Sequence, residues 1–243
     1  MYKEVFGFQT PNESLTIWRY LDFEKFMDLI IRNKLFLTRA DKFKDPYEGV
    51  LKLRDEVDYE LHKLQLETKK FNFLNCWHIN ENQSDAMWKC FLKTNNGLAI
   101  KTTIKKLKKS IDNTVEDIYI GKVYYRDLRK ITLSELMKEE QNLLCNGRGG
   151  TVNPFCYKRM DFEHEKELRI HFIDSPIPHL KKNEEKREPL EFKTININIQ
   201  DLIEEIVISP FSDEWFKGLV EDILLKIGLE IKVSKSDLYN LTV

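Results

Sequence analysis

Three glutamates alternate along the segment "FEHEKELRIHF", and an arginine follows at the same spacing. If this segment is a strand, Glu163, Glu165, Glu167 and Arg169 share one face, because strand side chains alternate between faces. A row of carboxylates is repulsive unless cations neutralise it, and Lys158 is close in the chain. Two interpretations stay open: a salt-bridged exposed strand face, or a catalytic Glu-x-Glu pair in which one carboxyl has a raised pKa.

The segment "TRADKFKDPYEG" places a second dense set of polar residues after a strand-like run. Its simplest interpretation is a turn, because the Asp-Pro step favours an extended residue before the proline. Alternatively, Thr38 and Arg39 at the end of a strand hold a phosphate, for which arginine offers a bidentate contact. Asp41, Asp45 and Glu48 then belong to the same wall of a site, facing the glutamate segment.

Aromatic and sulfur-containing residues cluster in "CWHINENQSDAMWKCF". Trp77 and Trp88 are expected in the core, because each buries a large apolar area. Cys76, His78 and Cys90 could be imagined as metal ligands, but no C-x₂-C pair occurs and a fourth ligand is lacking. No metal site is therefore expected, and His78 is interpreted as a hydrogen-bonded structural residue or a pocket wall.

Common enzyme signatures are absent from the sequence. There is no G-x-G-x-x-G or Walker loop, no G-x-S-x-G elbow and no H-E-x-x-H, and "GRGG" at 147–150 lacks the required context. A nuclease core would need a carboxylate–lysine pair on a strand. The one candidate pair, Glu184 and Lys186, falls in the charged loop "HLKKNEEKREP", where it is poorly placed.

Composition bounds the class of protein. The chain has 243 residues, 42% hydrophobic and 33% charged, with a formal net charge of -1, which fits one large domain over 1–243 with an ample core. The balanced charge gives no overall attraction to nucleic acid or to an anionic membrane. No signal peptide or apolar run of membrane-spanning length is visible, and four cysteines do not make a disulfide framework, so a cytoplasmic location is expected.

The opening residues predict a strand, a helix and a second strand. Strand patterns cover 17–20 and 35–38, and between them Asp22 is a plausible N-cap and Asn33 a plausible helix end. One buried helical stripe is expected from the apolar residues at helical spacing, which are Phe23, Phe26, Met27, Ile30 and Ile31.

Strands and helices then alternate irregularly along the chain. Further strands are expected at 71–79, 97–102, 118–125, 167–173, 205–210 and 229–234, and helices from 57, at 84–91, near 133–144 and at 213–227. Several strands are joined without a crossover helix. The pattern favours an α+β fold, with a mixed or split twisted sheet flanked by helices.

Taken together, these motifs resemble an uncharacterised bacterial family, domain of unknown function 2971. That family runs from an N-terminal aromatic-Arg-Tyr strand through a "DPfEg" turn, a cysteine-bearing strand and a Met-Trp helix to a "yEkEwRi" strand. The matches here are Trp18-Arg19-Tyr20, Arg39 to Gly49, Cys76, Met87-Trp88, Asn96-Gly97, Lys158 and Glu163 to Arg169. Phe91 and Phe162 stand where the family often has Tyr and Trp. The family brings no established activity.

A weaker resemblance is to the ADP-ribosyltransferase superfamily, including DarT-like enzymes that modify nucleic acid. It implies an ADP-ribosyltransferase-like fold with NAD as substrate, the pyrophosphate being held by Arg19 or Arg39. Thr38 would support the ribose, and Tyr20 or Trp77 would stack on nicotinamide.

By the same resemblance, Glu167 would stabilise the oxocarbenium-like charge and Glu165 would orient or deprotonate the acceptor. The further wall residues of this site are expected to be Asp41, Asp45, Glu48, Trp88, Lys158 and Arg169.

The function expected from these features is an NAD-dependent ADP-ribosyltransferase-like enzyme that modifies an unknown acceptor, nucleic acid or protein, in a toxin or phage-defence system. A cognate antitoxin or defence-system partner would fit that role. Two alternatives stay open: a non-enzymatic sensor that binds a nucleotide or a protein, and a metal-dependent nuclease using Asp41, Asp45, Glu165 and Glu167. The oligomeric state leaves no mark on the sequence.

Overall fold

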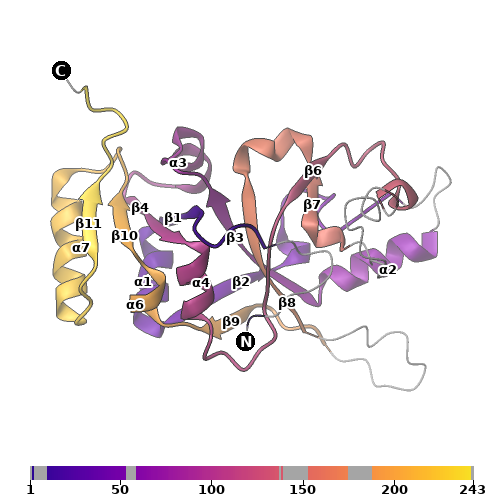
Figure 1. Ribbon diagram of the computed structural model, residues 1–243, viewed down its shortest axis with the longest axis horizontal. Helices are drawn as coiled ribbons and strands as arrows, with labels where there is room; N and C mark the ends of the chain where they lie inside the picture. The colour runs from indigo at the N-terminus through magenta and orange to yellow at the C-terminus, as the bar shows by residue number, and fades with distance from the viewer. Residues whose placement is uncertain are drawn as a thin grey trace.

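The computed structural model describes residues 2, 10–52, 59–136, 138, 153–174 and 188–241 (Figure 1). Its strands are β1 (Thr16–Asp22), β2 (Lys34–Arg39), β3 (Asn72–Ile79), β4 (Gly97–Thr103), β5 (Tyr119–Lys122), β6 (Tyr124–Arg126), β7 (Tyr157–Arg159), β8 (Glu167–Ile173), β9 (Lys193–Asn196), β10 (Glu205–Ile208) and β11 (Lys232–Lys235).

Among the described residues, six α-helices and three 3₁₀ turns lie between these strands. They are α1 (Phe23–Arg32), η1 (Ala40–Lys42), α2 (Tyr59–Lys69), α3 (Asp85–Phe91), α4 (Ile104–Ser110), η2 (Pro154–Cys156), η3 (Met160–Glu165), α6 (Ile199–Leu202) and α7 (Glu214–Lys226). A further helical stretch is described at 133–136. No described helix is both long and apolar enough to cross a membrane.

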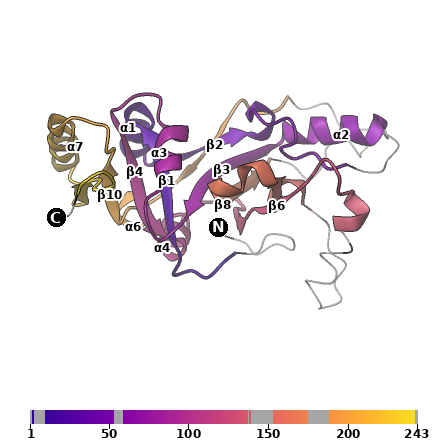
Figure 2. The same cartoon turned by 90° about the horizontal axis from the view of Figure 1, so that it is seen from above.

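Nine of the described strands form one sheet with a mixed but mostly antiparallel pattern. Its path is β11–β10–β4–β1–β3–β2–β9, and β8 and β5 extend it from β3. Within this sheet only β10 and β11 pair in parallel, whereas β6 and β7 form a separate parallel pair. The α7–β11 end and α2 lie at opposite ends of the molecule (Figures 1 and 2). The predicted α+β class with a mixed sheet is confirmed.

The opening strand–helix–strand unit follows its local signals. Asp22 occupies the N-cap position, but its carboxylate accepts a hydrogen bond from the backbone N–H of Lys93 instead of capping α1. Asn33 ends the helix with a φ of 51°, a left-handed conformation that asparagine tolerates. The predicted apolar stripe is wrong at one position, because the Ile31 side chain is 64% exposed.

The sheet buries its two faces against different partners. One face contributes residues such as Ile17, Leu37 and Ile170 to the main core, which also contains Phe26 of α1 and Val220 of α7. This alternation is the period-two pattern expected of strands.

The opposite face carries Trp18 and Tyr20, which pack against Met87 and Trp88 of α3. The register aligns Trp18 with His78 of β3, and His78 with Glu167 of β8, so these three side chains follow one another across this face. Helix α3 begins after Ser84, whose side chain caps the helix N-terminus.

The sheet splits at β3. On one edge β8 pairs continuously with β3 from Asn72 to His78. On the other edge β1 pairs only with the last two residues of β3, and β2 only with Phe73 and Leu74. Between these contacts Asn75, Cys76 and Trp77 pair with no neighbouring strand on that edge. β1 and β2 therefore diverge from the same edge of β3.

Side chains satisfy the backbone and polar groups that the split leaves without a ladder. The Arg19 guanidinium donates a hydrogen bond to the Cys76 carbonyl at 2.8 Å. The Asn75 carboxamide donates to the Phe36 carbonyl of β2 at 2.7 Å and accepts from Trp77 Nε1 at 2.8 Å. Buried polar groups need hydrogen-bond partners, so these contacts fix the positions of β1 and β2 relative to β3.

Some expected elements differ from those observed. The strand predicted at 118–125 is two strands, β5 and β6, which are separated at Val123 and belong to different sheets. The strand does not extend back to Glu163: Glu163 and Glu165 lie in η3, and Lys166, with a φ of 40°, separates them from β8. The "GRGG" segment, most of "HLKKNEEKREP" and Cys145 lie outside the described residues.

We predict that Asn75→Ala destabilises the fold by about 2 kcal/mol, because it leaves the Trp77 indole N–H and the Phe36 carbonyl without their partner. The free energy of unfolding in urea measures the loss. Asn196→Ala, at an exposed asparagine of β9, is the control and should change it by less than about 0.5 kcal/mol. Equal effects of the two substitutions would contradict the role given to Asn75.

Candidate functional site

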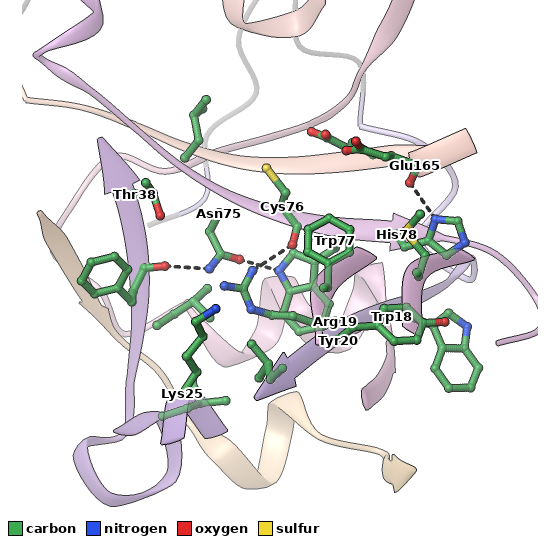
Figure 3. A pocket seen from close by; sticks show the side chains of 18 of the residues that line it. Trp18, Arg19, Tyr20, Lys25, Thr38, Asn75, Cys76, Trp77, His78 and Glu165 are labelled. Carbon is green, nitrogen blue, oxygen red and sulfur yellow. Dashed lines mark hydrogen bonds between the residues drawn. The ribbon is translucent and has the colours of Figure 1, made fainter. Parts of the chain in front are cut away.

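A cavity of about 520 Å³ lies at the split between β1 and β2 (Figure 3). Its lining comes from β1, α1, β2, β3 and α3, with Glu165 and Glu167 from η3 and β8. In Figure 3, Arg19 and Lys25 lie on one side of β3, and Glu165 lies on the other side. Cavities of this size hold nucleotide-sized or drug-sized ligands.

One end of the cavity contains a cation without a matching anion. Arg19 donates to the Cys76 carbonyl, and its guanidinium carbon lies 5.8 Å from the centre of the Trp77 ring. Among the described residues, no carboxylate lies within ion-pair distance of this guanidinium. Burial lowers the pKa of Arg19 to about 10, which leaves the group charged at neutral pH. A partly buried guanidinium without a carboxylate partner favours an anionic ligand.

The other end of the cavity holds two glutamates that share one ammonium group. Lys158 Nζ lies 2.7 Å from Glu165 Oε2 and 2.6 Å from Glu167 Oε1. Lys158 reaches this point from β7, Glu165 from the end of η3, and Glu167 from the start of β8. The left-handed Lys166 between the glutamates turns the chain so that both carboxylates meet the same cation.

A second cation completes the cluster. Arg169, on the same face of β8 as Glu167, donates to Glu167 Oε2 at 2.6 Å and to Glu48 Oε1 at 2.9 Å. A third bond reaches the Phe155 carbonyl at 2.8 Å. Arg169 is fully buried and Glu48 is 1% exposed. Each buried charge here has an opposite charge in contact, as burial requires.

The two glutamates of the cavity have opposite pKa shifts. Burial disfavours the charged form of Glu167, but Arg169 and Lys158 outweigh it and hold the pKa of this carboxyl far below its usual range. Burial raises the pKa of Glu165 to about 7, and the neighbouring Glu167 adds to the rise while Lys158 opposes it. One carboxylate thus stays ionised while its neighbour titrates near neutral pH, a separation typical of acid–base sites.

The backbone at the glutamates is held by two side chains. His78 Nδ1 donates to the Glu165 carbonyl at 2.6 Å, which fixes its proton on Nδ1. Burial lowers the pKa of His78, so the ring is neutral at pH 7. The Tyr125 hydroxyl accepts from the Glu167 N–H at 2.8 Å. Both contacts orient the glutamates without occupying their carboxylate oxygens.

Two other ionisable groups of the lining stay neutral. Burial raises the pKa of the Cys76 thiol, and the negative charge of Glu167 raises it further, so Cys76 is not a thiolate nucleophile. Burial also raises the pKa of Tyr20 to about 12, although a hydrogen bond from the Ser84 N–H opposes the rise.

The structure brings many of the predicted site residues together. Those that line the cavity are Arg19, Tyr20, Thr38, Trp77, Glu165 and Glu167. Glu48, Lys158 and Arg169 do not line it but contact the two glutamates or their cations. The charged turn after β2 does therefore meet the glutamate segment, through Glu48.

The remaining predicted wall residues lie elsewhere. Arg39 is not among the lining residues; its guanidinium contacts both carboxylate oxygens of Asp41, at 2.7 and 3.1 Å, and the Leu190 carbonyl. Asp45 forms a two-point ion pair with Arg159. Trp88 is fully buried in the core under α3 and does not line the cavity. Of the two candidate arginines, Arg19 is the one that reaches the cavity.

Sequence reasoning missed several residues of the lining. Asn75 is a polar residue between the apolar Leu74 and the cavity residues Cys76 and Trp77 of β3, and this position in a buried strand could have indicated a role. Phe36 is 42% exposed and stacks on Phe192 with ring centres 5.4 Å apart, a contact between distant segments. Lys25 lines the cavity from α1, but nothing in its spacing distinguishes it from a solvated lysine.

The described residues contain no group of three or more His, Cys, Asp or Glu side chains placed to hold a metal ion. The four carboxylates of the nuclease hypothesis do not converge on one point. Asp41 and Asp45 each pair with an arginine, and Glu165 and Glu167 share Lys158. A metal ion at any of them would have to replace these cations.

Comparisons with known proteins do not assign this chain to a family. No family model matches the sequence, so the resemblance to domain of unknown function 2971 is unconfirmed, and no curated protein matches it. Among solved structures, DarT of Thermus sp. 2.9 in complex with NAD+ matches with a TM-score of 0.42 and 11% identity, over 94% of this chain and 98% of that chain. A likeness this weak carries no argument about this chain.

We predict a pH-dependent stability difference at Glu165. Its pKa of about 7 in the folded state lies above the ordinary glutamate value of about 4.3. Between these values the folded protein binds one proton more than the unfolded chain, so the contribution of Glu165 to stability falls as pH rises through this window. Glu165→Gln removes that fall.

The free energy of unfolding of Glu165→Gln, relative to the unmodified protein, should therefore rise between pH 5 and pH 7 by roughly 2 kcal/mol. Urea unfolding at a series of pH values measures it. Glu163→Gln, an exposed position in the same 3₁₀ turn, provides the baseline for such a substitution. A pH-independent difference for Glu165→Gln would contradict the raised pKa.

Proposed function

We propose that the cavity binds NAD+ and that the protein is an ADP-ribosyltransferase-like enzyme, with a fold of that type. One observation carries the proposal: the cleft has an unneutralised guanidinium at one end and a paired, partly protonated set of carboxylates at the other. NAD+ has the complementary polarity, with an anionic pyrophosphate at one side of the nicotinamide ribose and a positively charged ring at the other.

Arg19 is the group that would hold the pyrophosphate. Its guanidinium uses one N–H for the Cys76 carbonyl, which fixes its position and leaves further donors for a ligand. Lys25 lines the same side of the cavity, where it pairs with Asp22 at 3.5 Å, and Glu24 and Asp28 of α1 also belong to the lining. A phosphate there would supply the counter-ion that Arg19 lacks.

The nicotinamide riboside would then extend towards the glutamates. Thr38 lies at the β2 wall and would support the ribose, and Tyr20 supplies an aromatic wall for the ring, whereas Trp77 lies beside Arg19 at the pyrophosphate end. The Tyr20 side chain is nearly buried, so the ligand does not need to order it.

Glu167 would stabilise the positive charge that develops on the ribose. In the reaction the bond from C1′ of the ribose to the nicotinamide nitrogen breaks, and its electron pair leaves with nicotinamide. The oxocarbenium-like charge is favoured by an ionised carboxylate that needs no reorganisation. Lys158 and Arg169 keep Glu167 ionised and rigid.

Glu165 would act on the acceptor. The acceptor nucleophile forms the new bond to C1′ and passes its proton to the Glu165 carboxylate, which suits a group that titrates near neutral pH. The acceptor is proposed to be a nucleic acid or a protein, and a toxin or phage-defence role with a cognate partner is in keeping with this chemistry.

A second candidate function is supported by the saturation of Glu167. Both of its carboxylate oxygens contact cations at 2.6 Å, which is also the arrangement of a purely structural ion pair. In this case the cleft would bind a nucleotide as a sensor, with no bond broken. Thermal stabilisation by a nucleotide panel without nicotinamide release would support the sensor.

We predict that the purified protein releases nicotinamide from NAD+ and that Glu167→Gln lowers the rate at least about 100-fold, the usual scale for losing a charge-stabilising group. Release is measured by chromatography with and without added nucleic acid, after circular dichroism has shown that the variant is folded. Retained activity in a folded Glu167→Gln variant would rule out the catalytic assignment.

We also predict that Arg19→Lys weakens NAD+ binding roughly tenfold or more, because lysine loses the planar, two-point contact with phosphate. Isothermal titration calorimetry gives the Kd. Arg129→Lys, at an exposed arginine paired with Asp127, is the matched control and should bind normally. An unchanged Kd for Arg19→Lys would place the pyrophosphate elsewhere.

A further inference from the structure

Three carboxylates contact only two cations at the glutamate end of the cleft. Glu48, Glu165 and Glu167 lie within 4 Å of Lys158 or Arg169, and the described residues place no other cation within that distance of any of them. Buried charges at these separations interact strongly, so the cluster favours one bound proton.

Groups on neighbouring elements do not remove this imbalance. Lys69 of α2 faces Glu48 but forms no ion pair with it, and burial lowers the pKa of Lys69 while Glu48 opposes that effect. Arg159 of β7 is engaged by Asp45.

The other facing groups are neutral at pH 7. They are the His78 ring and the Cys76 thiol of β3 and the Tyr125 hydroxyl of β6, and burial keeps all three uncharged. On the same 3₁₀ turn and the residue after it, His164 and Lys166 are exposed to solvent. Their charges are therefore screened at the cluster.

Geometry identifies the carboxylate that carries the proton. Glu167 has a cation on each oxygen, at 2.6 Å. Glu48 contacts Arg169 at 2.9 Å and Lys158 at 3.5 Å. Among the described cations, Glu165 contacts only Lys158, which also contacts Glu167. The Glu165 side chain is the most exposed of the three, at 14%. It also lines the cavity, so its proton can exchange with water and a ligand can reach it.

We propose that Glu165 holds a proton in the empty cleft and releases it to solvent when a positively charged ring enters, so that the general base is fully formed only when the NAD+ donor is bound. This inference rests on the proposed function, because that function brings a cationic ring to this end of the cleft. The direction follows from electrostatics: an added positive charge favours the ionised carboxylate. The raised pKa of Glu165 is in keeping with it.

The consequence is an order of events. In the empty site the protonated fraction of Glu165 cannot accept a proton, so an acceptor that enters first is activated less than one that enters after the donor. After the donor binds, the carboxylate is ionised and takes the proton of the acceptor as the new bond to C1′ forms and nicotinamide departs. The proton lost on donor binding goes to bulk solvent, and the acceptor supplies the one that Glu165 regains.

The first arm of the test needs no ligand. Glutamate labelled with ¹³C at the side-chain carboxyl is followed by NMR from pH 4 to pH 9. One signal should titrate near pH 7, disappear in Glu165→Gln, and titrate at higher pH in Lys158→Met, which removes the shared cation. Lys130→Met, an 85% exposed lysine, is the control and should leave it unchanged. A Glu165 signal already ionised at pH 6 would overturn the proposal.

The second arm measures proton release on binding. Calorimetry at pH 7 in two buffers of different ionisation enthalpy counts the protons. The ligands are NADH, whose ring is neutral, and an NAD+ analogue that keeps the positive ring but has carbon in place of the ribose ring oxygen, so that it cannot react. The analogue should release up to about half a proton, and NADH none; Glu165→Gln should release none with either ligand.

The outcomes separate the two proposals. Binding of the analogue without proton release, or equal release with NADH, overturns the donor-gated base and leaves NAD+ binding standing. Failure of both dinucleotides to bind overturns the proposed function and this inference with it, while the NMR arm still decides whether Glu165 holds a proton. If Lys158→Met fails to fold, the unmodified protein and Glu165→Gln decide both arms.

Discussion

The structure depends on one unusual feature of the sheet, which is that two strands leave the same edge of β3. β1 and β2 each pair with β3 over two residues, so the backbone between them has no ladder. Unpaired backbone groups inside a protein are costly, and Arg19 and Asn75 supply the missing hydrogen bonds. The divergence of β1 and β2 therefore accounts for the cavity, for the position of Arg19 in its wall and for the hydrogen bond of Asn75 to β2.

The continuous edge of β3 explains the other half of the site. Because β8 pairs with β3 without interruption, Glu167 and Arg169 are held in register with His78 and Cys76. Lys158 then joins Glu165 to this rigid row. A flexible edge would not place three carboxylates around two cations with contacts of 2.6–2.9 Å. The charge cluster thus acts as a support for Glu165, which is the most exposed of its carboxylates.

Local signals predicted most elements, whereas long-range contacts could not be predicted. Asn33 ends α1 and Ser84 caps α3 because the chemistry of these residues acts on their own backbone. The contact from Arg169 to Glu48 joins residues 121 positions apart, and no local pattern encodes it. The alternation of glutamates suggested one strand face, but Lys166 adopts a left-handed conformation and places Glu165 outside the strand. The sequence thus indicated several residues that the structure brings to the cavity, but not the contacts that these residues make.

The most direct test of the central claim is a crystal structure with the unreactive NAD+ analogue bound. We predict that the pyrophosphate contacts the Arg19 guanidinium at the split of β1 and β2, and that the positive ring faces Glu165 with Lys158 still joining the two glutamates. A dinucleotide bound in the reverse direction, or away from the split, would contradict the assignment of this cleft.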